Sequence, residues 1–320
     1  MKTILVTGGS GFIGSHYIDY LLTHYHDIVV INLDKLSYSA NQNNVRKWEG
    51  NDHYHFVQVD LAKKEQVGTI FQRYTIDEVV HFAAESHVDR SIQSAEPFFE
   101  SNVMGTLHLL DEAKNHQVQR FIQISTDEVY GSYPVGCADE NAPLLAKNPY
   151  SASKAAADLL VHSYYYTHGL PVVITRCTNN YGPHQHPEKL IPHLINRALN
   201  RQYLPIYGDG LQERDWLYVE DHCSGIDLVR QNGKIGEIYH IGAEHTVPNL
   251  EVAKSILQAF DLSESMIRHV KDRPGHDVRY SLDTTKLRQE LNWKPMISFD
   301  EGLQNTIRWY QEHLHWWKTT

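Results

Sequence analysis

Cysteine is scarce in this chain. Cys137, Cys177 and Cys223 are the only three among 320 residues, and they lie far apart in the sequence. Thiols this few and this widely spaced predict neither a disulfide framework nor a cysteine-based metal site. A reducing cytoplasm is therefore the location that we expect.

Long apolar runs and an excess of positive charge are also missing. No stretch approaches the roughly 18 apolar residues of a membrane-spanning helix, and a strand pattern at residues 3–7 leaves no room for a signal peptide. Lys and Arg total 29 against 39 Asp and Glu, so the net charge is −10. This balance argues against general nucleic-acid binding, but not against an anionic ligand held by a local basic cluster. We expect no membrane and no nucleic-acid partner.

Histidine, by contrast, is abundant, with 21 residues. Four pairs are spaced i, i+2, and none has a Glu or Cys at the spacing of a zinc site. We predict solvated surface histidines and no metal. The pairs are His24/His26, His53/His55, His184/His186 and His313/His315.

Short apolar runs alternate with amphipathic stretches through the first half of the chain. Such alternation predicts a parallel sheet covered by helices on both faces, and the right-handed crossover rule favours a doubly wound Rossmann domain. The strand-like runs are 3–7, 28–33, 54–59, 78–82, 120–125 and 172–175, and the helical stretches lie near 12–23, 64–73, 97–116 and 151–168.

After about Arg176 the pattern loosens, and Gly, Pro and aromatic residues cluster. We interpret 176–215 and 241–320 as a smaller mixed α/β substrate domain. Residues 1–175 then form the NAD-binding domain, to which 216–240 returns. With no low-complexity linker and no internal repeat between them, the two parts are expected to share one cleft. Helices are expected near 189–200, 220–231, 249–259, 285–291 and 299–315.

A glycine-rich segment, TGGSGFIG at 7–14, follows the first predicted strand and opens a helix. Gly8, Gly11 and Gly14 permit a tight turn, close approach of the backbone to a pyrophosphate, and close helix packing. The N–H groups at the start of the helix then attract the phosphates. A glycine turn without a ligand is the plain alternative.

Two acidic positions at strand ends support a dinucleotide site. Asp34, twenty positions beyond Gly14, favours NAD over NADP because a carboxylate accepts ribose hydroxyls and repels a 2′-phosphate. Asp60 and Leu61 are placed to meet the adenine edge, with helix capping an equal alternative for Asp60.

Tyr150 and Lys154 are four residues apart at the start of a predicted helix, so they share a face. A neighbouring ammonium and the positive nicotinamide favour the phenolate, which lets Tyr150 act as a base. An exposed i, i+4 pair is the alternative, and the preceding dinucleotide loop argues against it.

Thr126-Asp127-Glu128 lies between the glycine loop and that pair. Two adjacent carboxyls beside hydride-transfer groups suggest that an acid and a base also act, so that water leaves the substrate. One carboxyl must be protonated while the other is ionised, which requires surroundings that separate their pKa values. A polar turn after a buried strand is the alternative.

These motifs resemble the extended short-chain dehydrogenase/reductase superfamily. Within it, several segments closely resemble the dTDP-glucose 4,6-dehydratase family, and the resemblance spans essentially the whole chain. The segments are AAESHVDRS (83–91), STDEVYG (125–131), YSASKA (150–155), NNYGP (179–183), RDWLYVEDH (214–222) and DRPGHD (272–277).

The resemblance implies a reaction that uses NAD and a nucleotide-sugar substrate. Tyr150 would take the proton of the glucose 4-hydroxyl as hydride leaves C4. Thr126 would hydrogen-bond O4, and Lys154 would hold the nicotinamide ribose. Glu128 would then remove the C5 proton while Asp127 protonates the departing C6 hydroxyl.

The resemblance also assigns residues to the two ligands. The expected cofactor-binding set is Gly8, Gly11, Phe12, Ile13, Gly14, Asp34, Asp60, Leu61, Ala83, Tyr150 and Lys154. The expected substrate-binding set is Glu85, Ser86, Asn179, Asn180, Lys189, Arg214, Asn249, Arg273, His276 and Tyr280. Arg214 and Arg273 are the expected diphosphate partners because guanidinium binds phosphate bidentately, whereas Asn249 could instead cap a helix.

Three departures from the family pattern bear on the nucleotide preference. Glu213 stands before Arg214 where an apolar residue is more usual, and Val278 replaces an arginine before Arg279. The chain is also shorter around 133–148. These changes leave the expected chemistry intact.

The helical stretches 97–116 and 151–168 are the candidates for a four-helix bundle, through which extended members of the superfamily commonly dimerise. Leu159, Leu160 and Val161 give the second stretch more apolar surface than one sheet face needs, so we expect a homodimer. Completion of the monomer core is the alternative.

For the activity, a related epimerase, decarboxylase or dehydratase remains open, as does a non-catalytic NAD sensor.

Overall fold

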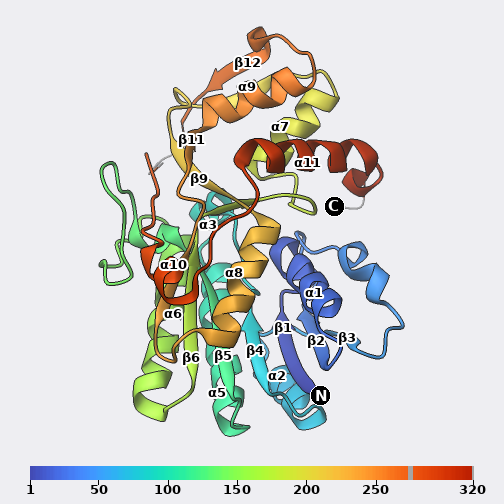
Figure 1. The fold of residues 1–320 in the computed structure, drawn as a ribbon, viewed down its shortest axis with the longest axis vertical. Helices are drawn as coiled ribbons and strands as arrows, with labels where there is room; N and C mark the ends of the chain where they lie inside the picture. The colour runs from blue at the N-terminus through green and yellow to red at the C-terminus, as the bar shows by residue number, and fades with distance from the viewer. Residues whose placement is uncertain (273–276, 319–320) are drawn as a thin grey trace.

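The computed structural model describes residues 1–272 and 277–318. Its largest element is a parallel sheet of seven strands in the order β10-β6-β5-β4-β1-β2-β3 (Figure 1). The order reverses between β1 and β4, which leaves a crevice at the carboxyl ends of the strands. The strands are β1 (Lys2–Thr7), β2 (Ile28–Asp34), β3 (Tyr54–Gln58), β4 (Glu78–His81), β5 (Arg120–Thr126), β6 (Val172–Cys177) and β10 (Ile238–Ile241).

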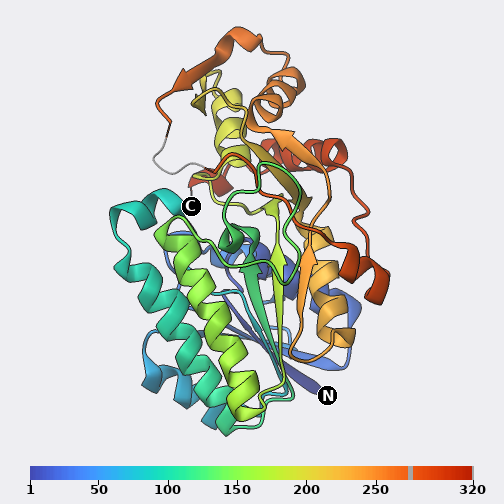
Figure 2. The same cartoon turned by 90° about the vertical axis from the view of Figure 1, so that its left-hand side faces the viewer.

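Helices cover both faces of this sheet, as its continuous apolar strands require. On one face, α1 (Phe12–His24) and α8 (Val219–Asn232) share a buried cluster with β1 and β6. On the other, α2 (Lys64–Arg73), α5 (Gly105–Asn115) and α6 (Pro149–His168) pack together, and α5 and α6 run side by side in Figure 2. The predicted doubly wound Rossmann architecture is confirmed.

The remaining elements form a smaller part with its own apolar cluster above the strand ends (Figure 1). It contains a three-stranded sheet in the order β11-β9-β7 and a pair formed by β8 and β12. Its elements are β7 (Asn179–Tyr181), β8 (Leu204–Tyr207), β9 (Glu213–Tyr218), β11 (Thr246–Pro248), β12 (Ile267–Val270), α7 (Leu190–Leu199), α9 (Asn249–Ala259) and α11 (Phe299–Glu312). Between β9 and β11 the chain returns to the parallel sheet as α8 and β10; the domain boundaries at 175, 215 and 240 stay a prediction.

Shorter elements connect these units. They are η1 (Gln42–Trp48), α3 (Val88–Gln93), α4 (Glu96–Phe99), η2 (Glu100–Met104), η3 (Asp127–Tyr130), α10 (Thr285–Leu291), η4 (Glu264–Met266) and η5 (Trp316–Lys318). Among the described helices, none is both long and apolar enough to cross a membrane.

Candidate active site

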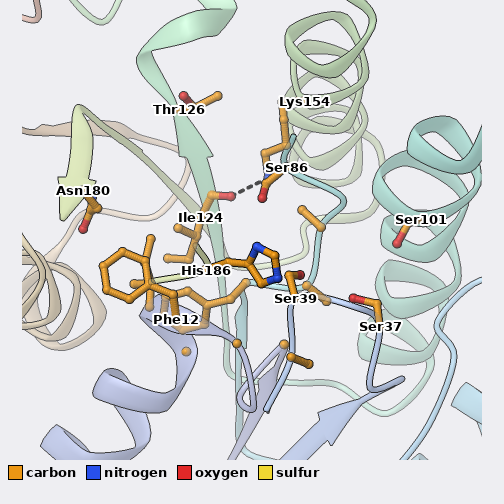
Figure 3. Close-up of a pocket in the computed structure, with 18 of the residues that line it drawn as sticks. Phe12, Ser37, Ser39, Ser86, Ser101, Ile124, Thr126, Lys154, Asn180 and His186 are labelled. Carbon is orange, nitrogen blue, oxygen red and sulfur yellow. Dashed lines mark hydrogen bonds between the residues drawn. The ribbon is translucent and has the colours of Figure 1, made fainter. Parts of the chain in front are cut away.

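A cavity of about 280 Å³ lies at the carboxyl ends of the parallel strands (Figure 3). It brings together most of the residues that the sequence assigned to cofactor, catalysis and substrate, although they come from segments far apart in the chain. These are Gly8, Gly11, Phe12, Ile13, Gly14, Asp34, Asp60, Leu61, Ala83, Ser86, Thr126, Asp127, Glu128, Tyr150, Lys154, Asn179, Asn180 and Lys189.

The glycine turn lines the cavity. Residues with a side chain do not fit at two of its positions, Gly8 and Gly14. Gly8 has φ +69°, and a Cβ there would lie 2.8 Å from the backbone of Ala83. A Cβ on Gly14 would lie 2.3 Å from the Gly8 carbonyl oxygen. The turn leads into α1, and within the described chain no side chain caps that helix. Its first N–H groups therefore suit a phosphate, as a bound NAD requires.

Asp34 ends β2 and lies buried beside this turn. Its carboxylate accepts hydrogen bonds from the backbone N–H groups of Ser10 at 3.0 Å and Leu36 at 2.8 Å. Burial raises the pKa of Asp34, and these two bonds oppose the rise. A carboxylate fixed in this way lines the cavity where the ribose of NAD would lie.

Asp60 accepts a hydrogen bond within a turn and does not cap a helix. Its Oδ1 accepts from the N–H of Ala62 at 3.0 Å, whereas Lys63 is the residue that precedes α2. The helix-capping alternative for Asp60 is thus wrong, and Asp60 is one of the residues that line the cavity.

Thr126 ends β5 and starts the turn η3, which carries both acidic residues. The N–H of Glu128 donates to Oγ1 of Thr126 at 3.3 Å, and the Thr126 hydroxyl donates to Oδ1 of Asp127 at 3.1 Å. Ser and Thr favour such capping positions because their oxygen satisfies a free N–H. The polar-turn interpretation is correct as structure, and the turn faces the cavity.

Asp127 has the electrostatics of a proton donor. Burial raises its pKa well above the usual value, and the nearby Glu128 carboxylate raises it further. The hydrogen bond from Thr126 and the charge of Arg214 act in the opposite direction but do not outweigh burial. The direction of this shift favours the protonated form of Asp127, and the roles of Asp127 as acid and Glu128 as base stay predictions.

Tyr150 and Lys154 lie on the first two turns of α6, which a capping box from Asn148 and Ser151 fixes. Burial, followed by the charge of Glu128, raises the pKa of Tyr150 well above 10.0, and a hydrogen bond with Thr126 opposes this.

The Lys154 ammonium donates to the Ile124 carbonyl oxygen at 2.6 Å (Figure 3). Burial lowers the pKa of Lys154, whereas the charge of Asp158 raises it. Burial and the charge of Glu128 therefore oppose a Tyr150 phenolate, whereas the hydrogen bond with Thr126 favours it. The help expected from Lys154 and from the nicotinamide stays a prediction.

Arg214 on β9 lies close enough to Asp127 for its charge to lower the pKa of that carboxyl. Its guanidinium donates to the Asp277 carbonyl oxygen at 2.9 Å and lies 4.4 Å from the ring centre of Tyr280. The Tyr280 hydroxyl donates to Asp277 at 2.6 Å, and the charge of Glu128 helps burial to raise the Tyr280 pKa. Contact of Arg214 with the diphosphate and of Tyr280 with the nucleotide end stay predictions.

Glu213 does not oppose Arg214 directly. Its carboxylate pairs with Arg279, with Oε2 3.2 Å from Nε. The acidic departure from the family pattern is therefore balanced by a neighbouring arginine, and Val278, which precedes Arg279, is exposed.

Other predicted substrate residues divide into two groups. Lys189 lines the cavity and donates to the Ser86 carbonyl oxygen at 2.7 Å, whereas Glu85 lies outside it and pairs with Lys35 at 2.7 Å. Asn249 also lies outside; it is the first residue of α9 and Pro248 precedes the helix, so the capping alternative for Asn249 is wrong. Arg273 and His276 fall outside the described residues.

Sequence reasoning missed a cluster at the cavity mouth. Glu188 accepts from the Tyr38 hydroxyl at 2.8 Å and lies 3.3 Å from Nε of Arg90. Both Glu188 and His186 line the cavity. The one available signal was the position of Glu188 next to Lys189.

The surface prediction for the pair His184/His186 is wrong. The His184 ring lies 4.9 Å from that of His16 and 5.0 Å from that of Trp309, and burial lowers its pKa well below the usual value. Across residues 1–272 and 277–318, no group of three or more His, Cys, Asp or Glu side chains is arranged to hold a metal.

The fold and the site together define a class. NAD-dependent short-chain dehydrogenases/reductases combine a Rossmann sheet with a glycine turn after the first strand and a Tyr-Lys pair, which here lies on α6. The family model described as GDP-mannose 4,6 dehydratase matches residues 5–306. The chain belongs to this family of dehydratases.

Individual relatives agree with this assignment. The chain is 49% identical to a dTDP-glucose 4,6-dehydratase from Streptomyces niveus over 98% of its own length and 94% of the relative's. The enzyme of the same name from Haemophilus influenzae is 48% identical, with coverage of 97% and 98%. The crystal structure of DesIV, a dTDP-glucose 4,6-dehydratase from Streptomyces venezuelae with NAD and TYD bound, matches with a TM-score of 0.96, 46% identity and 99% coverage of both chains.

Proposed function

We propose that this protein is an NAD-dependent enzyme that converts dTDP-glucose to dTDP-4-keto-6-deoxyglucose and water. The observation that carries the proposal is the pair of buried Asp127 and half-buried Glu128 in the same cavity as Tyr150, Lys154 and the glycine turn. An epimerase has no use for a base at C5 together with an acid at C6. An NAD sensor needs neither pair.

The side chains of the site divide the proton transfers of this reaction among them. Tyr150 takes the proton of the 4-hydroxyl, with Thr126 hydrogen-bonded to O4, as C4 becomes a ketone. The ketone makes the C5 hydrogen acidic, so Glu128 removes it while Asp127 delivers its proton to the C6 oxygen, which leaves as water. Glu128 afterwards returns a proton to C5 as hydride adds to C6.

NAD is the cofactor that the site fits. When bound, NAD accepts the hydride from C4 and gives it back to C6, so the reaction has no net oxidation. The α1 N-terminus would hold the pyrophosphate, Asp34 the adenosine ribose, and Lys154 the nicotinamide ribose. Lys189, Asn180 and Arg214 are the residues that we assign to the diphosphate side of the substrate.

The experiment is incubation with dTDP-, UDP-, CDP- and GDP-glucose in deuterated water, followed by NMR of the sugar. We expect a 4-keto-6-deoxy product from dTDP-glucose with solvent deuterium at C5. Water loss without deuterium at C5 would contradict Glu128 as the base. Turnover of another nucleotide sugar in preference to dTDP-glucose would overturn the substrate assignment.

We also propose that the protein works as a homodimer in the cytoplasm. Apolar side chains remain exposed on α6 and on the segment before α5, and these elements run side by side (Figure 2). They are Phe99, Met104, Leu159 and Tyr166. A second copy of the chain would cover this surface by forming a four-helix bundle with it. The three free cysteines fit the proposed location, because a reducing compartment keeps thiols free.

A further inference from the structure

A chain of buried polar groups lies behind the turn η3, away from the cavity. Tyr130, the last residue of that turn, is 1% exposed. Arg176 donates a hydrogen bond to its hydroxyl oxygen, and that hydroxyl lies 2.6 Å from Nε2 of His240. Nδ1 of His240 in turn lies 3.0 Å from the carbonyl oxygen of Asp283.

One protonation pattern satisfies every group in this chain. If His240 is neutral with its proton on Nδ1, it donates to Asp283 and accepts from Tyr130 through Nε2. Burial lowers the pKa of His240 to about 3, which keeps the ring neutral. Burial also raises the pKa of Tyr130 to about 12, which keeps its proton in place. The direction of each hydrogen bond is therefore fixed.

A second arm runs from Arg176 to the hydride-transfer groups. Its Nε donates to Oδ2 of Asp158 at 2.9 Å, and the Ser125 hydroxyl donates to the same oxygen at 2.9 Å. Asp158 lies one turn beyond Lys154 on α6, and Ser125 directly precedes Thr126 on β5. The two arms thus meet at one buried ion pair, between Arg176 and Asp158.

The turn that carries the acid and the base is fixed at both ends. Thr126 caps its start, and Tyr130 anchors its end to β6 and β10. Between these ends, the N–H of Leu145 donates to the Val129 carbonyl oxygen, the N–H of Gly131 donates to that of Glu128, and the Val129 side chain packs in a buried apolar cluster. A four-residue turn has little rigidity of its own, so the orientation of its two carboxyls depends on these anchors.

We propose that Tyr130 is a positioning residue for the elimination step, whose buried hydroxyl aims Asp127 and Glu128 at C6 and C5 of the sugar without touching the substrate. This rests on the proposed function. Hydride transfer depends on Tyr150 and Lys154. The Lys154 ammonium is held by the Ile124 carbonyl oxygen, and a capping box at Asn148 and Ser151 fixes the start of α6; neither contact involves Tyr130.

The test is Tyr130→Phe, followed through a single turnover of dTDP-glucose by the absorbance of reduced nicotinamide and by NMR of the sugar. We expect formation of reduced cofactor within about 2-fold of wild type and elimination slower on the order of 10- to 100-fold, the scale of a small misplacement. Reduced cofactor then accumulates.

Tyr239→Phe is the matched control, because it removes another fully buried hydroxyl that bonds Glu290 and the N–H of Lys234 instead. It should change neither step. Equal slowing of both steps in Tyr130→Phe, or no change in either, would overturn the inference. A wild-type protein that does not turn over dTDP-glucose would instead defeat the proposed function.

Circular dichroism and thermal unfolding establish whether Tyr130→Phe is folded. His240→Phe, which keeps Tyr130 but removes the acceptor of its proton, carries the same prediction independently. If His240→Phe is folded and its elimination step is as fast as in wild type, the role assigned to the Tyr130 hydroxyl is wrong.

Discussion

At Asp127, burial and the neighbouring carboxylate both favour the protonated form. A carboxyl whose pKa is raised on folding contributes stability that is fully present below its unfolded pKa and is lost as the pH rises through the folded value. The same surroundings that prepare Asp127 to give a proton therefore reduce the stability of the folded protein at higher pH.

Asp127→Asn should remove that pH dependence. The affected pH range runs from about 3.8, the usual pKa of an aspartate, up to the raised pKa of Asp127. Within it, the free energy of unfolding of the variant relative to wild type should increase by up to about 1.4 kcal/mol per pH unit. Urea unfolding at a series of pH values measures the difference. Asp52→Asn, at an exposed aspartate, controls for lost charge, and a difference independent of pH would contradict the argument.

Glu128→Gln separates the two halves of the reaction. The amide keeps the size of the side chain but cannot take the C5 proton, so reduced cofactor should form while product formation falls by about 10²- to 10⁴-fold. Absorbance of reduced nicotinamide and NMR of the sugar follow the two events. A variant that forms no reduced cofactor would place the role of Glu128 in the first step.

Among the elements, the junction of β1 and α1 has the least room for change. Gly14→Ala should weaken NAD binding by at least about 10-fold, because its Cβ would lie 2.3 Å from the Gly8 carbonyl oxygen. Isothermal titration with NAD measures the loss. Gly68→Ala on α2 is the control, since its Cβ would meet only Glu112, at 3.6 Å. Equal affinities of the two variants would show that the turn does not hold the cofactor.

Elements with a strong repeating pattern could be predicted from the sequence. The helices expected at 249–259 and 285–291 match α9 and α10 in their bounds. The stretch 97–116 is instead divided, because the chain widens into a π-helical turn at Glu100–Met104. The three-residue strands β7 and β11 are too short to show alternation, and they exist only because β9 pairs with both.

The same distinction applies to the site. Motifs that are contiguous in the sequence, such as 7–14 and 126–128, identified their own parts of the cavity. Arg214 could not be placed in this way, because its partner is the backbone of Asp277, distant in the chain. The contacts of Tyr130 could not be predicted in this way either, since its partners Arg176 and His240 lie on strands whose proximity only the fold reveals.

At the scale of the whole molecule, α6 leaves apolar side chains exposed that the proposed dimer would cover. Leu159 is 63% exposed there. Leu159→Glu should convert the dimer to a monomer, because burying an unpaired carboxylate at an interface costs several kcal/mol. Analytical ultracentrifugation measures the mass. Val135→Glu, at a loop residue that is 89% exposed, should remain dimeric, and a wild-type monomer would contradict the proposed assembly.

The central claim is that one hydride leaves the fourth carbon of the sugar and returns to the sixth. The direct measurement is turnover of dTDP-glucose labelled with deuterium at C4, in ordinary water, with NMR and mass analysis of the product. If the hydride moves in this way, the deuterium is found at C6 of the 4-keto-6-deoxy product. Deuterium retained at C4 or released to water would contradict it.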